Sequence, residues 1–547
     1  MIAKIRDLDA DSGDELVELI RRAKVSGRNE FVILVGTKGA GKSTFIERFF
    51  RHVLPADIAG DCIVLRVDLA KAEVGPDGVA EWVNQRLLAT AEQTVFKGAP
   101  TYDELQGIFF GEYERWRIGQ YKHLYDSDKQ QFKILFGKHM DNVRERRPHE
   151  YICRMLGDVV RSRKKLPCLV FDNADHHSVE FQEAVFKYAR SIYHEQLCLV
   201  VVPVTDVTTW KLSRHGAIKS FDSESLYLPT PDTRRIIERR IQYIGGKVEA
   251  TRRGQSAEYF FNRGITLSLE NIAAFAACLE RVFVQTGVVA RWIANLANFN
   301  VREILHLTRK VISSPHLDAP MLLKVYIAKS TLILDQRRIK EAIIREGYDI
   351  YPAGRAEFVQ NIFDIGSVQE TTPLLGIRIL QLLRDCRKRP LGRDEFIDLG
   401  ELYGYLGAMG IEEPVAEEWL GSLLENELCF AYDPTIRDIT QAERVQLAPA
   451  GLQHLIWAKE DWDYIRAMSE VAPYHSQHYY EQAMHCCEQK TRRAQLEGIA
   501  NFFEYVASED KQFCLVPDHA QFAGQKSISR AIADSAVKLK RKLYGAT

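Results

Sequence analysis

The chain has no long hydrophobic segment and no excess of charge of either sign. Its longest apolar runs, such as residues 197–204, are far shorter than the roughly 18–20 residues that a membrane-spanning helix needs. Its 73 basic and 74 acidic side chains give a formal net charge of −1. Overall charge therefore does not indicate nucleic-acid binding, although a local basic patch is compatible with it.

The chain also lacks a cysteine framework and a secretory signal. Its ten cysteines follow no disulfide or metal-site spacing, which predicts reduced thiols. Residues 1–16 turn acidic within a dozen positions, unlike a secretory signal. At roughly 150 residues per domain, 547 residues predict three or four domains. We expect a soluble, multidomain, cytoplasmic protein.

The first block, residues 1–230, alternates strand-like and helix-like patterns, which favours a parallel α/β sheet. Its strand candidates are continuously apolar, as strands covered on both faces by helices require. Between the second and third candidates lies a helical stretch, and about 95–146 of it is an insertion dense in aromatic and charged residues. The predicted strands are Phe31–Val35, Cys62–Leu69, Pro167–Asp172, Leu197–Val204 and Leu226–Leu228.

Residues 36–43 have the pattern G-x-x-x-x-G-K-S between an apolar strand and a helix. In that context the pattern predicts a phosphate-binding loop (P-loop), whose backbone N–H groups and helix N-terminus hold a polyphosphate. Lys42 is expected to reach the β- and γ-phosphates of ATP, and the Ser43 hydroxyl to bind Mg²⁺. The alternative is a glycine-rich turn that matches by accident. The expected nucleotide-binding residues are Gly36, Gly39, Ala40, Gly41, Lys42, Ser43 and Thr44.

The apolar strand that ends at Asp172 predicts the second half of the ATP site. A carboxylate there would hold Mg²⁺ beside the loop, whereas the alternative is any buried strand that ends in a turn. The next residue is Asn173, and its amide cannot accept a proton. Asp175 is the nearest carboxylate that could act as the general base, with a helix N-cap as its alternative role. We therefore expect slow ATP hydrolysis.

The two motifs lie 172 − 42 = 130 residues apart with a strand between them, and this order resembles the additional-strand P-loop ATPases of the AAA+ and STAND families. The resemblance extends over roughly residues 25–460. It implies that Thr205, at the end of the next strand, senses the γ-phosphate. It also implies that Arg302, in Asn300-Val301-Arg302, is the second sensor of a lid, although a surface arginine at a helix N-terminus has the same sequence pattern.

Residues 371–457 show three helices, two strands and a further helix, which is the order of a winged helix. A DNA-reading winged helix places its third helix in the major groove, between phosphates. Here that helix and its lead-in carry five glutamates and no basic residue, and only Arg437 and Arg444 lie on the wing. We therefore favour a protein-contacting or autoinhibitory module over a DNA-binding one. The glutamates are Glu412, Glu413, Glu417, Glu418 and Glu425.

Together these patterns predict an α/β P-loop core with a parallel sheet (1–230), an all-α lid (231–370), a winged helix (371–457) and a C-terminal helical region (458–547). The resemblance implies an ATP- and Mg²⁺-dependent conformational switch that assembles with itself or a separate effector protein, in a bacterial setting such as antiviral defence. The alternatives are a DNA-bound AAA+ regulator of the replication-initiator or transposition type, and a scaffold whose ATP is only structural.

Overall fold

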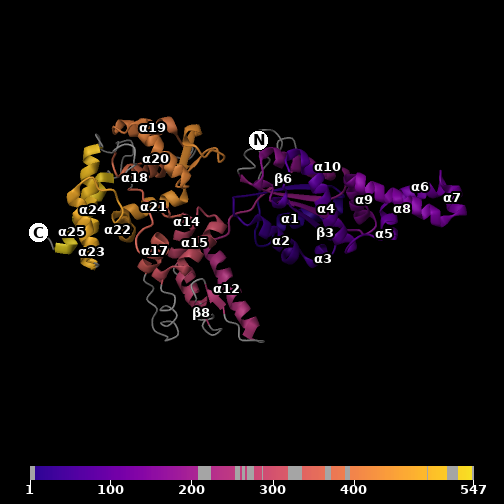
Figure 1. The fold of residues 1–547 in the computed structure, drawn as a ribbon, viewed down its shortest axis with the longest axis horizontal. Coiled ribbons are helices and arrows are strands. Elements are labelled where there is room, and N and C mark those ends of the chain that lie inside the picture. The colour runs from indigo at the N-terminus through magenta and orange to yellow at the C-terminus, as the bar shows by residue number, and fades with distance from the viewer. Residues whose placement is uncertain are drawn as a thin grey trace. The chain divides into compact units, whose positions relative to one another are not determined.

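The chain forms two compact units, Met1–Thr230 and Pro231–Thr547 (Figure 1). Among the predicted helices, 321–333 and the first part of 269–283 lie outside the described residues. The computed structural model describes residues 6–206, 223–252, 259–261, 265–267, 276–285, 287–317, 336–363, 371–387, 395–489, 491–513 and 528–544.

The first unit contains a six-stranded sheet in the order β1-β6-β2-β5-β4-β3, and every neighbouring pair is parallel. Five of its strands coincide with the predicted apolar runs to within two residues at each end, which confirms a parallel α/β core. The two-residue edge strand β1 was not predicted. The strands are β1 (Arg6–Asp7), β2 (Glu30–Gly36), β3 (Cys62–Asp68), β4 (Leu166–Asp172), β5 (Leu199–Thr205) and β6 (Glu224–Tyr227).

Both faces of this sheet are buried under helices. Successive side chains of a strand point to opposite faces, so neighbouring residues join different apolar clusters. In β2, Phe31 and Ile33 belong to one apolar cluster, and Val32 and Leu34 belong to the other. Helices α4 (Val79–Phe96), α9 (Pro148–Arg161) and α10 (Val179–Glu195) contribute to the first cluster. Helices α1 (Asp14–Ser26), α2 (Lys42–Arg48) and α3 (Ala56–Ala59) contribute to the second.

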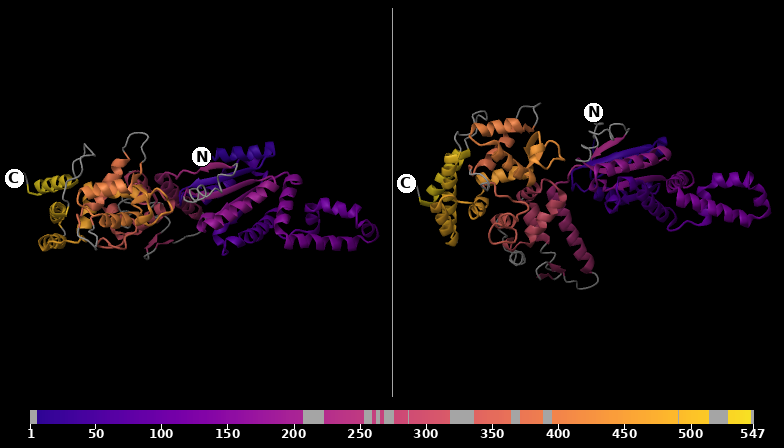
Figure 2. Two further views of the ribbon diagram at one scale, coloured as in Figure 1. Left: turned by 90° about the horizontal axis from the view of Figure 1, so that it is seen from above. Right: turned by 45° about the horizontal axis from the view of Figure 1, so that its top comes forward.

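The predicted insertion is a helical arm that extends away from the sheet (Figures 1 and 2). Its aromatic residues form a core of their own: the rings of Tyr113 and Trp116 lie 5.4 and 5.3 Å from the ring of Phe136, each in an edge-to-face arrangement. This packing explains why a solvent-surrounded segment is so rich in aromatic residues. The arm consists of α5 (Tyr102–Ile108), α6 (Phe110–Ile118), α7 (Lys122–Ser127) and α8 (Lys129–Arg146).

The second unit begins with helices, to which a short antiparallel pair of strands, β7 (Tyr259–Phe261) and β8 (Ile265–Leu267), is added. The sequence predicted only helices here, and strands of three residues are too short to show a periodicity. The helices are α12 (Thr233–Arg252), a π-helix at Glu280–Gln285, α14 (Val288–Leu296), α15 (Val301–Ser313) and α17 (Gln336–Arg345).

The winged-helix order is present in the same unit. Its antiparallel sheet has the order β10-β11-β9, so a third strand of two residues joins the two that the sequence predicted. The elements are α18 (Leu375–Cys386), β9 (Ile397–Asp398), α19 (Leu399–Ala408), α20 (Glu413–Glu425), β10 (Cys429–Ala431), β11 (Arg444–Leu447) and α21 (Pro449–Glu460).

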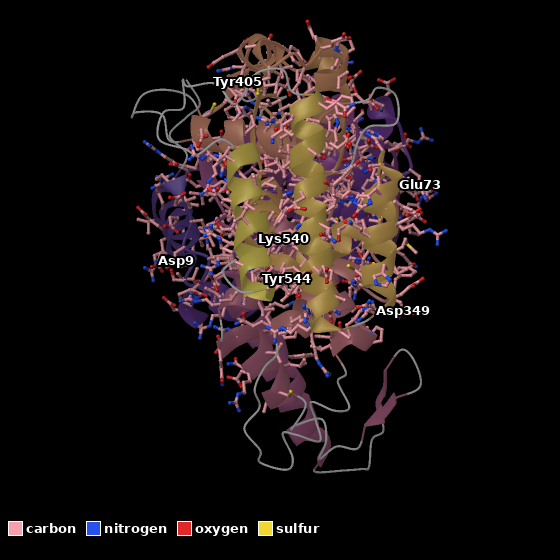
Figure 3. The ribbon with its side chains drawn as sticks, turned by 90° about the vertical axis from the view of Figure 1, so that its left-hand side faces the viewer. Asp9, Glu73, Asp349, Tyr405, Lys540 and Tyr544 are labelled. Carbon is pink, nitrogen blue, oxygen red and sulfur yellow. The ribbon has the colours of Figure 1, made fainter. Side chains whose placement is uncertain are left out.

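The chain continues in α22 (Trp462–Ser469), α23 (Gln477–Glu488), α24 (Arg492–Phe513) and α25 (Ile528–Tyr544). Figure 3 looks onto α23, α24 and α25, with Lys540 and Tyr544 labelled on α25. A buried ion pair joins α24 to the winged helix: the Arg378 Nη2 lies 2.9 and 2.8 Å from the two carboxylate oxygens of Asp510. None of the described helices is both long and apolar enough to cross a bilayer.

Candidate nucleotide site

The predicted P-loop connects β2, which ends at Gly36, to α2, which begins at Lys42. Gly39 and Gly41 have φ angles of 81° and 87°, in the left-handed region that favours glycine. They let the chain turn back so that Ala40 is buried and donates its N–H to the Thr37 carbonyl oxygen at 3.1 Å. The loop therefore ends in a helix N-terminus, where backbone N–H groups without intrahelical partners can hold an anion.

Lys42 lies folded back over this loop. Its Nζ donates to the carbonyl oxygens of Gly36 at 3.0 Å and Thr37 at 3.2 Å. Burial lowers the pKa of the Lys42 ammonium, and the nearby carboxylates of Asp175 and Asp172 oppose that shift. The loop thus has a partly desolvated cation at its centre, as expected of a group that binds phosphate oxygens.

Ser43 and Asp172 meet at the carboxyl ends of the strands. The Ser43 hydroxyl donates to Oδ1 of Asp172 at 3.0 Å, and Asp172, the last residue of β4, is only 1% exposed. A hydroxyl and a carboxylate are the oxygen donors that Mg²⁺ uses beside a nucleotide, so this pair fits the predicted metal. The other oxygen of Asp172, Oδ2, accepts a hydrogen bond of 2.5 Å from Nη2 of Arg66 on β3.

Asn173 joins this pair to a third strand end. Its φ of 64° is left-handed, and its Nδ2 donates to Oδ1 of Asp68 at 2.7 Å. Its Oδ1 accepts from the Ser43 hydroxyl at 3.4 Å. Asp68, the last residue of β3, was missed in the sequence. The available signal was a carboxylate that ends an apolar strand, but only the sheet order brings that strand beside β4.

Asp175 lies in a single 3-10 turn, Ala174–His176, that follows Asn173. The N-cap of the next helix, α10, is Ser178, whose hydroxyl oxygen accepts the Phe181 N–H at 3.3 Å. The alternative role of Asp175 as the cap of that helix is therefore wrong. Its carboxylate is close enough to Lys42 to affect the lysine pKa.

Of the remaining predicted residues, Thr205 and Thr44 lie in the first unit and Arg302 lies in the second. Thr205 is buried at the end of β5, in register opposite Gly36, and β5 lies between β2 and β4. Thr44 follows Ser43 on α2 and is exposed. Arg302 belongs to the second unit, where it is exposed in the first turn of α15 and its N–H is capped by the Asn300 side chain at 3.0 Å. The sensor role of Arg302 stays a prediction.

Comparisons with known proteins include a match to a protein-family model. Residues 25–205 match the model of the AAA domain. No curated protein matches the chain.

Among solved structures, the chain is similar to the Aeropyrum pernix ORC2 protein in its ADP form, with 13% identity and a TM-score of 0.38 over 85% of this chain and 97% of that one. It is also similar to CDC6P from Pyrobaculum aerophilum, with 9% identity and a TM-score of 0.30 over 86% and 96%. A third is Drosophila ORC bound to DNA, with 10% identity and a TM-score of 0.29 over 79% and 91%.

These structural likenesses are distant, so the loop, the strand order and the family match carry the assignment. Strand β5 between β2 and β4, the loop of residues 36–43 and the Ser43–Asp172 pair all lie within the matched segment. Residues 25–205 therefore form an AAA domain, a P-loop ATPase domain of the AAA+ type.

Proposed function

We propose that the chain is an ATP-binding and ATP-hydrolysing conformational switch. The observation that carries the proposal is the 3.0 Å contact between Ser43 and Asp172, directly beside the P-loop lysine. In the proposed site the loop N–H groups and Lys42 bind the phosphates. Ser43 and Asp172 hold Mg²⁺, which neutralises charge that develops on the phosphate oxygens.

In the proposed switch, binding and hydrolysis of ATP change the conformation of the core and of the elements that follow it in the chain. Thr205 would sense the γ-phosphate from within the sheet, and Arg302 would do so from the second unit. A γ-phosphate can shift such an equilibrium only through contacts that differ between the two states. Self-assembly or a separate effector protein would receive the signal. An antiviral setting is supported only by the resemblance of the sequence to the STAND family.

The second candidate is a DNA-bound AAA+ regulator, and two observations favour it. The solved structures to which the chain is distantly similar include Drosophila ORC bound to DNA and the Aeropyrum pernix ORC1 protein in complex with DNA. In this chain, α25 exposes Lys538, Arg541 and Lys542 within two turns, a local basic surface of the kind that binds phosphate backbones. The exposed glutamates on α20 oppose contact of the winged helix itself with DNA.

The experiment that tests ATP binding compares two lysines of the same loop in the full chain. Lys42→Ala should abolish ATP binding, measured by titration with a fluorescent ATP analogue, because it removes the half-buried cation of the loop. Lys38→Ala is the matched control: Lys38 is exposed on the loop, so affinity should change by less than about threefold. Equal ATP affinity in the Lys42 variant and the parent would refute the proposal.

Turnover separates the switch from a scaffold with structural ATP. A switch that hydrolyses ATP releases phosphate continuously under excess ATP, even if slowly. A chain that binds ATP and releases no phosphate over several hours would support the scaffold alternative.

A further inference from the structure

We infer that Asp68 is the general base of ATP hydrolysis and that Asn173 positions it. The inference rests on the proposed function and adds a residue on β3 to the ATP site. The position directly after Asp172, which an acidic residue could fill, holds an amide that cannot take a proton. A carboxylate nevertheless lies next to this amide. It belongs to Asp68, the last residue of the neighbouring strand β3.

The strand register brings the two carboxylates together. In the parallel pair of β3 and β4, Asp68 is directly opposite Asp172. Each of them is the last residue of its strand, and neighbouring strands lie about 4.8 Å apart. Both residues therefore lie at the same edge of the sheet, beside the P-loop. In a parallel sheet this carboxyl edge is where ligands bind.

The Asn173 side chain connects Asp68 to the loop. Its amide donates to Asp68 at 2.7 Å on one side and accepts from the Ser43 hydroxyl at 3.4 Å on the other. One amide group therefore separates the Asp68 carboxylate from the hydroxyl expected to bind Mg²⁺. The left-handed backbone of Asn173 directs the amide to this position, and asparagine adopts that conformation more readily than most residues.

The Asp68 carboxylate keeps one oxygen available. Both of its hydrogen bonds, from Asn173 Nδ2 and from the Ala70 N–H at 3.3 Å, are to Oδ1. Within the described part of the chain, Oδ2 accepts no hydrogen bond. Asp68 is half-buried, so a water molecule can reach it. Asp175, by contrast, lies in a short turn where no hydrogen bond to described residues holds its carboxylate.

The proposed step is in-line attack by water on the γ-phosphorus. A bond forms between the water oxygen and phosphorus, and the bond from phosphorus to the bridging oxygen of ADP breaks. A water proton passes to Oδ2 of Asp68, which later returns it to solvent. Asn173 takes no proton; by donating to Oδ1 it holds the carboxylate in place, and so it is a positioning residue.

The test uses the full chain and exchanges the two side chains. Asp68→Asn keeps a carbonyl oxygen that can accept from Asn173 but removes the base. The rate constant of turnover should fall by about 10²-fold or more, while affinity for the ATP analogue changes by less than about threefold. The double variant Asp68→Asn/Asn173→Asp restores one carboxylate and one amide with their places exchanged. It should recover at least about tenfold of the lost rate.

Asp57→Asn is the matched control, since it removes an exposed carboxylate on α3 outside the ATP site, and its turnover should stay within about threefold of the parent. A larger fall in turnover for Asp175→Asn than for Asp68→Asn would assign the base to Asp175 and overturn the inference. Turnover of Asp68→Asn within about twofold of the parent would overturn the inference, as would loss of ATP binding in that variant. Absence of ATP binding by the parent would instead refute the proposed function.

Discussion

Arg66 on β3 and Asp172 on β4 form an ion pair at the carboxyl edge of the sheet, and the carboxylate of this pair is almost fully buried. The other oxygen of Asp172 accepts from Ser43. The carboxylate expected to hold Mg²⁺ is thus neutralised by a cation of the chain itself. Because a buried charge needs a partner, Arg66 and the metal ion compete for the same group.

The first prediction follows from that competition. Arg66→Ala leaves Asp172 without its cation, so the melting temperature of the unliganded chain should fall by several degrees. Mg²⁺ with ADP should then raise the melting temperature by more than it does in the parent, because the metal no longer displaces an arginine. Both shifts are measured by thermal unfolding with and without Mg²⁺.

Arg51→Ala is the control for this experiment. Arg51 is exposed, and the ion pair that it makes with a described residue is to Glu47 one helical turn away, so its loss should change neither shift appreciably. Equal Mg²⁺-dependent shifts in the Arg66 variant and the parent would show that Arg66 does not restrict access of the metal.

The second prediction concerns the metal carboxylate. Asp172→Ala should abolish Mg²⁺-dependent turnover, because it removes the only carboxylate among described residues that contacts Ser43. ATP binding without Mg²⁺ should persist, since Lys42 and the loop N–H groups are unchanged. Phosphate release and ATP affinity, each measured over a Mg²⁺ series, separate the two effects. Turnover above about a tenth of the parent rate would place the metal ligand elsewhere.

The core of the ATP site could be predicted from sequence because local patterns encode it. The strands are continuously apolar, and the loop of residues 36–43 connects one of them directly to a helix. The pairings of Asp172 with Arg66 and of Asn173 with Asp68 could not be predicted. They join residues 106 and 105 positions apart in the chain, across two strands whose adjacency is set by the whole sheet.

The short strands were missed for a different reason. A strand of two or three residues, such as β1, β7 or β9, shows no alternation to detect. The helical arm could be located from its composition, but the partners of its aromatic residues depend on how α6 packs on α8.

The third prediction is a pH dependence of stability at His454. This side chain is fully buried on α21, where its Nε2 accepts the Gln360 N–H at 2.8 Å and its Nδ1 donates to the Ala450 carbonyl oxygen at 2.7 Å. Burial lowers the pKa of His454 to about 4. Between the ordinary histidine pKa of about 6.5 and that value, the unfolded chain binds a proton that the folded chain refuses.

The stability that neutral His454 provides is therefore complete above about pH 6.5 and is lost as the pH falls toward about 4, by up to roughly 3 kcal/mol. His454→Gln should lower stability at pH 7 and reduce the loss between pH 6.5 and 4, measured by urea unfolding at several pH values. His478→Gln, at an exposed position on α23, should leave the pH profile unchanged. A profile for His454→Gln that parallels the parent would contradict the assignment.

The last prediction distinguishes a protein-facing winged helix from one that reads DNA. Glu418 and Glu425 are exposed on α20 and lie seven residues apart, so they share a helix face. If that face contacts protein, α20 should contribute nothing measurable to the binding of duplex DNA by the full chain. Glu418→Lys/Glu425→Lys should then raise DNA affinity and its salt dependence, because two repulsions become two phosphate contacts.

The matched control carries the same change of charge elsewhere: Glu481→Lys/Glu488→Lys, both exposed on α23. DNA titrations over a salt series compare how the same four-unit increase in charge changes DNA affinity when it is placed on α20 and on α23. If α20 lies away from DNA in the parent, the α20 variant should gain more than the α23 variant, and its ATP-dependent assembly, followed by mass measurement, should be disturbed. Tight, salt-sensitive DNA binding by the parent that the α20 lysines weaken would instead mean that the glutamates read base edges, and it would favour the DNA-bound regulator.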